Sequence, residues 1–160
     1  MRTFNLIVAC SENRVIGRSG RLPWRIAEDR DFFMAKTAGQ IVVLGRLGFE
    51  SWPGAVADGR RAVVLASHGT FPSARSAPSL PEALAAAEGL PGEIYICGGQ
   101  QIYEEAIALP QAARLYLTLV HAEVQGDRFF PDWTGIFKRE VDRRESSDAN
   151  WRYTFLTLER

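Results

Sequence analysis

The stretch Leu-Pro-Trp-Arg-Ile-Ala-Glu-Asp-Arg-Asp-Phe-Phe, residues 22–33, marks the point where a long loop gives way to the first helix. Pro23 ends the loop, and we expect a helix over residues 26–38. Gly39 follows, and a glycine at this place typically ends a helix. Because the segments before and after this loop and helix are apolar, the chain begins in the order strand, helix, strand.

Asp29 lies on a helical stripe whose other members are mostly apolar. On the 3.6-residue repeat this stripe also contains Ile26, Phe33 and Thr37. A carboxylate among apolar groups must find hydrogen-bond donors or have a raised pKa. The structural alternative is that Glu28 and Asp29 only favour the positive end of the helix. The rest of the chain has to decide between these two interpretations.

Length and composition favour a single domain over residues 1–160. The chain has 160 residues, 46% of them hydrophobic, which is enough for one full-sized core. Nineteen basic residues balance nineteen acidic ones, and this balance argues against a nucleic-acid platform or a polybasic membrane surface.

The cysteine and histidine content favours a reduced protein without a metal. The two cysteines, Cys10 and Cys97, form no CxxC motif, and the two histidines are too few for a metal-binding cluster. No segment is apolar over 18 residues, and the start of the chain has too short an apolar run for a signal peptide. We therefore expect a cytoplasmic protein.

Apolar strands alternate with helices along most of the chain. Strands are expected over residues 3–10, 40–45, 61–67, 93–97 and 113–122, with two more around 137–144 and 153–159. Helices are expected over residues 26–38, 46–51, 80–88 and 100–109. This alternation predicts an α/β fold in three layers, with a mostly parallel sheet between helices. The last strands have no helix between them and should pair antiparallel at one edge.

Polar and glycine residues cluster where the predicted strands end. Ligands of such folds bind beside the carboxyl ends of the strands, which places residues 9–11, 45–48, 66–68 and 97–99 on one rim. At 45–48 (Gly-Arg-Leu-Gly) and again at Gly98–Gly99, a glycine turn leads from a strand directly into a helix. Free N–H groups at a helix start bind anions, and two such turns fit the separate phosphates of a dinucleotide. Ordinary turn chemistry is the structural alternative at each turn, and the absence of GxGxxG excludes a usual Rossmann fingerprint.

Longer motifs resemble one family over essentially the whole chain. They are NRVIGRSGRLPW (13–24), the acidic helix with Asp29, LGRLGFES (44–51), CGGQQIYEEAI (97–107), LYLTLVHAEVQGDRFFP (115–131) and YTFLTLER (153–160). Their order and spacing resemble bacterial-type dihydrofolate reductases. The resemblance implies an eight-stranded mostly parallel sheet with an antiparallel C-terminal strand and four main helices. It also implies NADPH-dependent reduction of 7,8-dihydrofolate to tetrahydrofolate, with hydride transfer to C6 and protonation at N5, by a monomer.

The resemblance also implies roles for individual residues. Asp29 would bind the pterin, Thr118 would brace its carboxylate, Trp24 would hold an ordered water, and Tyr103 would lie near the nicotinamide. Substrate would further contact Ile7, Val8, Arg30, Phe33, Trp52, Val56, Arg60 and Cys97, with Arg60 pairing with the glutamate α-carboxylate. NADPH would contact Ala9, Ile16, Gly17, Arg46, Leu47, Gly48, Ser67, His68, Gly98, Gly99, Gln100, Gln101, Ile102 and Tyr103. In this family the Gly98–Gly99 bond is cis.

Five positions depart from the family pattern, and two of them, Ala66 and Gln101, make the usual environment of the 2′-phosphate less polar, although His68 can compensate. Arg30 replaces an apolar residue, and its side chain either leaves for solvent or reaches the glutamate tail beside Arg60. Gly48 replaces a threonine and keeps only the backbone N–H. Cys97 replaces a branched aliphatic residue, and we interpret it as a small hydrophobe because no histidine partner is suggested.

Other functions remain open at this point. One is a reductase for another reduced pterin, such as dihydromethanopterin, and another is the related reductase of riboflavin synthesis. A protein that binds NADPH or folate without turnover belongs to a different class. Arg60 favours folate, and the set Trp24, Asp29 and Thr118 favours catalysis.

Overall fold

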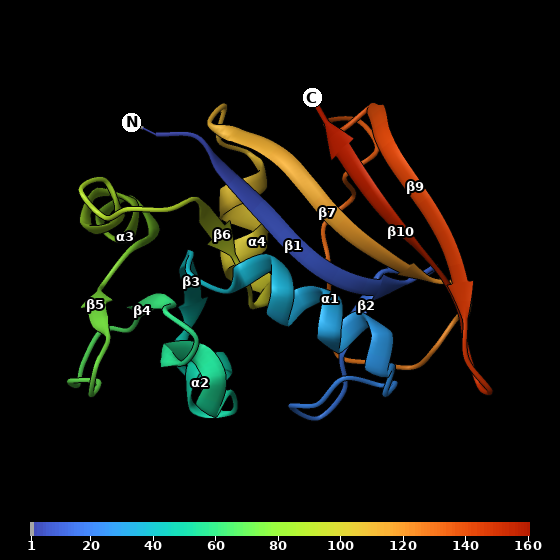
Figure 1. The fold of residues 1–160 in the computed structure, drawn as a ribbon, viewed down its shortest axis with the longest axis horizontal. Coiled ribbons are helices and arrows are strands. Elements are labelled where there is room, and N and C mark those ends of the chain that lie inside the picture. The colour runs from blue at the N-terminus through green and yellow to red at the C-terminus, as the bar shows by residue number, and fades with distance from the viewer. Residues whose placement is uncertain (1) are drawn as a thin grey trace.

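An eight-stranded sheet runs through the centre of the computed structural model, which describes residues 2–160 (Figure 1). The strands are β1 (Phe4–Ser11), β2 (Val15–Gly17), β3 (Ile41–Gly45), β4 (Arg61–Leu65), β5 (Arg75–Ala77), β6 (Ile94–Ile96), β7 (Ala112–Val120), β8 (Arg128–Phe129), β9 (Arg139–Ser147) and β10 (Arg152–Glu159). The helices are α1 (Ala27–Thr37), α2 (Arg46–Glu50), α3 (Leu80–Ala87) and α4 (Gln100–Ile107), with a 3₁₀ turn at Pro53–Val56. The predicted α/β class and the four main helices are confirmed.

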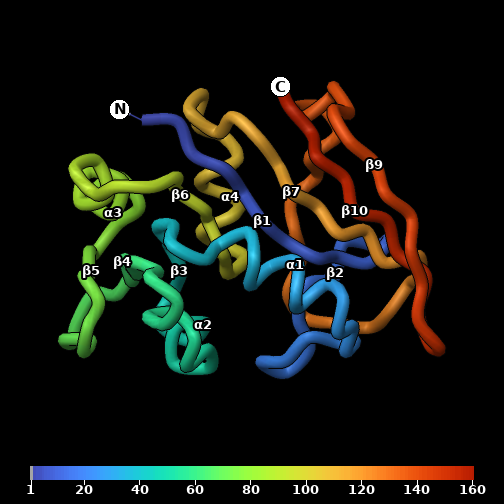
Figure 2. The backbone as a smooth tube through the Cα atoms, in the orientation of Figure 1, coloured from blue at the N-terminus to red at the C-terminus, as the bar shows by residue number. Residues whose placement is uncertain are grey.

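The strand order in the large sheet is β5-β4-β3-β6-β1-β7-β10-β9. The first six strands of this order pair in parallel, whereas β10 pairs antiparallel with both β7 and β9. The expected antiparallel edge is therefore confirmed. Figure 2 shows both termini at one end of the strands, near the top of the view, and α2 and β2 lower, where the parallel strands β3 and β1 end.

Alternate residues of β1 explain why helices cover both faces of the sheet. Leu6, Val8 and Cys10 pack in the core shared with α3 and α4, while Ile7 contributes to a cluster with aromatic residues of α1. Successive side chains of a strand point to opposite faces, so an apolar run without alternation must be buried on both. Figure 1 accordingly shows α1 and α4 on opposite sides of the sheet, which confirms the three layers.

Helix α1 begins and ends where its sequence predicts. Ile26 is the N-cap residue, and Gly39, with φ of +74°, follows the C-cap. The left-handed conformation at Gly39 is accessible to glycine without steric cost, which is why the helix stops there. Ile26 and Thr37 on the predicted stripe are both buried.

Five short or polar elements differ from the sequence prediction. The segment 11–25 is not a continuous loop, because β2 forms within it and pairs with β8. Strand β5 and the 3₁₀ turn were also not predicted, and β9 begins and ends later than expected. The bounds of β9 were misplaced because its residues are almost all exposed and mostly charged, so no apolar pattern marks the strand. Within residues 2–160, no helix is long and apolar enough to span a membrane.

Candidate active site

Asp29 and Thr118 meet at the centre of the candidate site. The Thr118 hydroxyl donates a hydrogen bond to Asp29 Oδ1 over 2.6 Å. Thr118 lies in β7 beside Ala9 of β1, and Asp29 reaches it from the first turn of α1. Burial raises the pKa of the Asp29 carboxyl, and the Thr118 hydrogen bond offsets part of that shift. A partly desolvated carboxyl with one protein donor can accept further donors from a ligand.

Trp24 lies near the same site and has an unsatisfied polar atom. Its side chain is buried, and its indole Nε1 has no hydrogen-bond partner within residues 2–160. A buried donor normally pairs with protein, water or ligand. This unpaired N–H fits the water-holding role that the sequence resemblance implied.

Apolar side chains from three parts of the chain pack together on the face of the sheet that α1 covers. Ile7, Phe33 and Cys97 share one cluster on the α1 face of the sheet. Cys97 also joins the neighbouring cluster that contains Trp52, whose ring lies 5.0 Å from the Phe33 ring. Burial raises the pKa of the Cys97 thiol, so this side chain stays neutral, as expected for a small hydrophobe.

Two residues predicted to line the site, Val8 and Tyr103, have side chains in the core cluster that includes α3 and α4. Val8 packs in the core on the α3 and α4 face, so only its backbone is available to the α1 side. Tyr103 is buried in the same core, and its hydroxyl donates to the Ile7 carbonyl over 2.7 Å. Tyr103 therefore fixes the backbone of β1 where this strand borders the site.

Arg60 is buried by its own neighbours. Its side chain has no exposed surface, and its guanidinium donates to Thr37 Oγ1 and to the carbonyl of Met34, among other acceptors. Asp58 accepts from Nη1 over 3.1 Å, and the Trp52 ring lies 5.1 Å from Cζ. Nη2 also faces the Met34 sulfur at 3.5 Å, a weak acceptor. No pattern in the amino-acid sequence indicated that Arg60 is buried.

The two glycine turns predicted to bind phosphates lie directly against each other. The Gly45 N–H donates to the Gly98 carbonyl over 2.9 Å, which joins the start of α2 to the start of α4. The bond between Gly98 and Gly99 is cis, as the resemblance implied. A Cβ built on Gly99 would meet no atom within 4 Å, so the turn is open on that side. The open side of the turn, together with the uncapped N–H groups at the start of α4, is suited to a phosphate.

Substituting Gly98 with alanine is expected to destabilise the fold by about 1–3 kcal/mol. Gly98 has φ of +105°, and an added Cβ would lie 3.1 Å from the Tyr103 ring. Tyr103 cannot move aside, because its hydroxyl is bonded to β1. Urea unfolding of the ligand-free protein measures the loss, and Gly135→Ala, where a Cβ meets open space, is the control. Equal stability of the two variants would contradict this account of the turn.

The remaining predicted cofactor contacts are mostly exposed. Leu47, Gly48, Ser67, His68, Gln101 and Arg46 are exposed on this rim, while Ile102 is buried and Ile16 is partly buried. The Arg46 guanidinium pairs with Glu50 over 2.7 Å. The Gln100 side chain is used within the protein, since it accepts from the Phe129 N–H and donates to Glu104.

The segment 11–25 is held by Asp127, which sequence reasoning did not single out. The Asp127 carboxylate accepts from the Ser19 N–H, and the backbone N–H of Asp127 donates to the Gly17 carbonyl over 3.0 Å. Gly126 fits between these partners only because it has no side chain, since a Cβ there would lie 2.2 Å from Val15. The only sequence signal was the pair Gly126–Asp127, which is common in turns.

Arg30 and Val56 lie at the outer edge of the site. Arg30 is exposed on α1 next to Asp29, and Val56 is 38% exposed at the end of the 3₁₀ turn. The position of Arg30 is compatible with both of its predicted interpretations.

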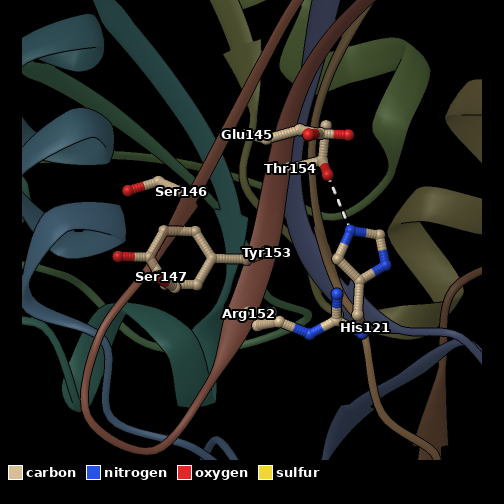
Figure 3. Close-up of a pocket in the computed structure, with 7 residues that line it drawn as sticks. All are labelled: His121, Glu145, Ser146, Ser147, Arg152, Tyr153 and Thr154. Atoms are coloured by element: carbon tan, nitrogen blue, oxygen red, sulfur yellow. Dashed lines mark hydrogen bonds between the residues drawn. The ribbon is translucent and has the colours of Figure 1, made fainter.

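A surface hollow of about 310 Å³ lies elsewhere, along β9 and β10 (Figure 3). Its lining residues are His121, Glu145, Ser146, Ser147, Arg152, Tyr153 and Thr154. His121 is hydrogen-bonded to Thr154 over 2.6 Å, and the Tyr153 hydroxyl to Glu28 over 2.8 Å. The hollow contains none of the predicted site residues.

Comparisons with known proteins agree over the full length of the chain. The family model described as dihydrofolate reductase matches residues 3–160. The dihydrofolate reductase of Neisseria meningitidis serogroup B is 39% identical over 160 residues, covering 98% of this chain and 97% of that protein. The type 3 dihydrofolate reductase of Salmonella typhimurium is also 39% identical, with the same coverage. The structure of Enterococcus faecalis dihydrofolate reductase complexed with NADP(H) and RAB-propyl has a TM-score of 0.85 and 31% identity, covering 99% of this chain and 96% of that one.

Proposed function

This chain belongs to the dihydrofolate reductase family, and we propose that it reduces 7,8-dihydrofolate to tetrahydrofolate with NADPH, using Asp29 as the residue that binds the pterin. The observation that carries this assignment is the hydrogen bond between Thr118 and the partly buried Asp29 carboxyl at the rim where the parallel strands end. Ligands of such sheets bind at this rim.

Asp29 has the chemistry that a pterin requires. The 2-amino group and the neighbouring N3–H of a pterin are two parallel donors, and a carboxylate accepts both. Thr118 fixes one carboxylate oxygen, so the plane of the carboxylate is set before substrate arrives. Positive charge that develops on the ring is then stabilised by a fixed negative group in a dry environment.

Proton delivery is assigned to a water molecule near Trp24. When bound, NADPH supplies the hydride that reaches C6 of the pterin. N5 must gain a proton, and the unpaired Trp24 Nε1 is available to hold the water that provides it. The segment 11–25, anchored through Ser19 and Asp127, would exclude bulk water by closing over the reacting rings.

The residues of the rim fit NADPH. The start of α4 would hold the pyrophosphate, since its N–H groups are uncapped and the Gly99 side of the turn is open. Arg46, Ser67 and His68 would hold the 2′-phosphate. Arg46 must exchange its partner Glu50 for the phosphate, which is inexpensive because both side chains are exposed.

Arg60 is proposed to bind the α-carboxylate of the glutamate tail. Four of its N–H groups are directed at oxygen acceptors of the protein. The fifth, on Nη2, faces only the weakly accepting Met34 sulfur. A substrate carboxylate that displaces the Met34 thioether would gain a charge-assisted hydrogen bond. Folate, which carries a glutamate, is favoured over pterins that lack this group.

Arg30→Leu tests whether Arg30 assists Arg60. Because Arg30 is exposed on the turn of α1 that carries Asp29, its guanidinium can reach the tail of a bound folate. We expect a threefold to tenfold higher KM for dihydrofolate, corresponding to about 1 kcal/mol of a partly exposed charge pair. The KM for a pterin without the glutamate should not change. Equal effects on both substrates would contradict a contact to the tail.

One assay tests the function directly. NADPH oxidation is followed at its absorbance band with dihydrofolate, with a pterin lacking the glutamate, and with NADH in place of NADPH. Turnover that needs both NADPH and the glutamate supports the proposal. Turnover of the truncated pterin alone would favour a different pterin reductase, and binding without turnover would indicate a non-catalytic binder.

We further propose that residues 1–160 act as one domain and as a monomer in the cytoplasm, without a nucleic-acid or membrane partner. The two cysteines are free, and the formal net charge is zero, which support this setting. Sedimentation of the purified protein tests the monomer.

A further inference from the structure

Glu28 precedes Asp29 in the first turn of α1 and is bound by three side chains of the C-terminal hairpin formed by β9 and β10. Ser146 Oγ and Tyr153 Oη donate to Glu28 Oε1 over 2.6 and 2.8 Å. Arg144 Nη1 donates to Oε2 over 2.6 Å. These donors lower the pKa of Glu28 to about 2, with Ser146 contributing most. Both carboxylate oxygens are fixed, so Glu28 ties the start of the helix to the edge of the sheet.

Aromatic packing supports the same connection. The Arg144 guanidinium lies over the Phe155 ring, 4.3 Å from its centroid. The Phe32 ring of α1 packs against the same Phe155 ring, and the two ring centroids are 5.0 Å apart. Arg144 is thus oriented by a stacking contact as well as by Glu28, which limits its freedom to turn to solvent.

The hairpin and the partner of Asp29 belong to one continuous piece of sheet. Phe155 of β10 is the register partner of Thr118 in β7, and Thr118 donates to Asp29. Two consecutive residues of α1, Glu28 and Asp29, are therefore anchored to neighbouring strands. Any movement of the helix start away from β10 would also lengthen the contact between Asp29 and Thr118.

The hydrogen bonds from the hairpin to Glu28, called the anchor below, come from one side of the hairpin only. In Figure 3, Ser146 and Tyr153 lie on one side of the strands, and Thr154 and His121 lie on the other. Arg143, next to Arg144, pairs instead with Glu140 and Glu145. The opposite side of the hairpin therefore provides control positions in the same strand.

We propose that Glu28 is a positioning residue, which holds the start of α1 on the C-terminal hairpin and thereby keeps Asp29 against Thr118 and away from water. This inference rests on the proposed role of Asp29. It assigns a function to an acidic residue that would otherwise only favour a helix start. The hairpin thereby becomes part of the support of the site.

The proposal predicts a change at Asp29 when the anchor is broken. A looser helix start admits water to Asp29, so the pKa of its carboxyl falls toward the ordinary value. Loss of the Glu28 charge lowers the same pKa by removing like-charge repulsion, so the two causes must be separated. The other titratable or charged groups facing the two carboxylates are Arg144 from β9, Tyr153 from β10 and Tyr103 from α4, with Asp148 acting on Tyr153.

Two variants separate these causes. Glu28→Gln removes the charge and weakens the anchor, while Ser146→Ala combined with Tyr153→Phe removes two donors without changing any charge. Glu145→Gln and Ser147→Ala are the matched controls on the same strand. The pKa of Asp29 is measured by carbon NMR titration of its carboxyl in the ligand-free protein. Single-turnover hydride transfer and thermal melting are measured in parallel, and Ser146→Ala alone replaces the double variant if that variant does not fold.

We expect both anchor variants to lower the pKa of Asp29 by about half a unit or more and to slow hydride transfer by about threefold to tenfold, with the controls unchanged. A shift in Glu28→Gln alone would mean that Glu28 acts through its charge, which overturns positioning. A lower melting temperature without any shift would show a merely structural contact, which also overturns it. If the unmodified protein does not reduce dihydrofolate, the proposed function fails, while the NMR titration still decides the inference.

Discussion

Replacing Asp29 with asparagine is expected to slow hydride transfer to dihydrofolate by about 100-fold or more, the usual scale for a positioned acid–base group. Asparagine keeps the size of the side chain and can still accept from Thr118. It has no negative charge, however, so the cation that develops on the pterin loses its fixed counter-charge. Stopped-flow measurement of a single turnover near neutral pH measures this step directly.

The pH dependence of the same variant is a second expected result. Reduction consumes a proton, so the rate of hydride transfer should fall as the pH rises. In the unmodified protein the midpoint of this fall in rate should lie above the ordinary pKa of an aspartic acid, because burial raises the pKa of Asp29. Asp29→Asn should lose this titration.

Stability separates a loss of catalysis from a loss of folding. A carboxyl whose pKa is raised in the folded state lowers stability once the pH exceeds its unfolded pKa. Asp29→Asn should therefore melt at the same or a higher temperature near neutral pH. Asp31→Asn, at an exposed position of the same helix, is the control and should keep full activity. Wild-type turnover in Asp29→Asn would show that Asp29 does not bind the pterin.

Replacing Arg60 with methionine is expected to lower the free energy of unfolding by about 3 kcal/mol. The guanidinium satisfies the carbonyls of Met34, Gly54 and Ala57 and the Thr37 hydroxyl, and methionine can donate to none of them. Asp58 would also lose its partner. Urea unfolding measures this loss, and the midpoint should shift without a change in slope.

The same variant should bind dihydrofolate more weakly. In the fraction that is folded, the KM for dihydrofolate should rise at least tenfold, while the KM for a pterin lacking the glutamate should change little. Arg61→Met is the control, because the Arg61 guanidinium donates to the carbonyls of Gly39 and Pro91 at the surface. If Arg60→Met lost stability but kept its KM, Arg60 would be a structural residue and the tail would bind elsewhere.

The amino-acid sequence by itself determined the class of the fold and the identity of the family. Apolar strands such as Ile41–Gly45 and helices such as Ala27–Thr37 follow from local periodicity, which depends only on neighbouring residues. Asp29 was marked by its place on an apolar stripe, and the turn at Gly98 by its glycines. The roles of the individual site residues remain predictions, to be decided by the experiments above.

Only the tertiary structure decided which distant residues meet. Asp29 and Thr118 are 89 residues apart, and Glu28 and Tyr153 are 125 apart, so no local pattern connects them. The burial of Arg60, the pairing of β2 with β8 and the exposed strand β9 were likewise set by packing against segments far along the chain. Periodicity shows which face of an element is buried, whereas the partner of a polar group depends on how the elements are assembled.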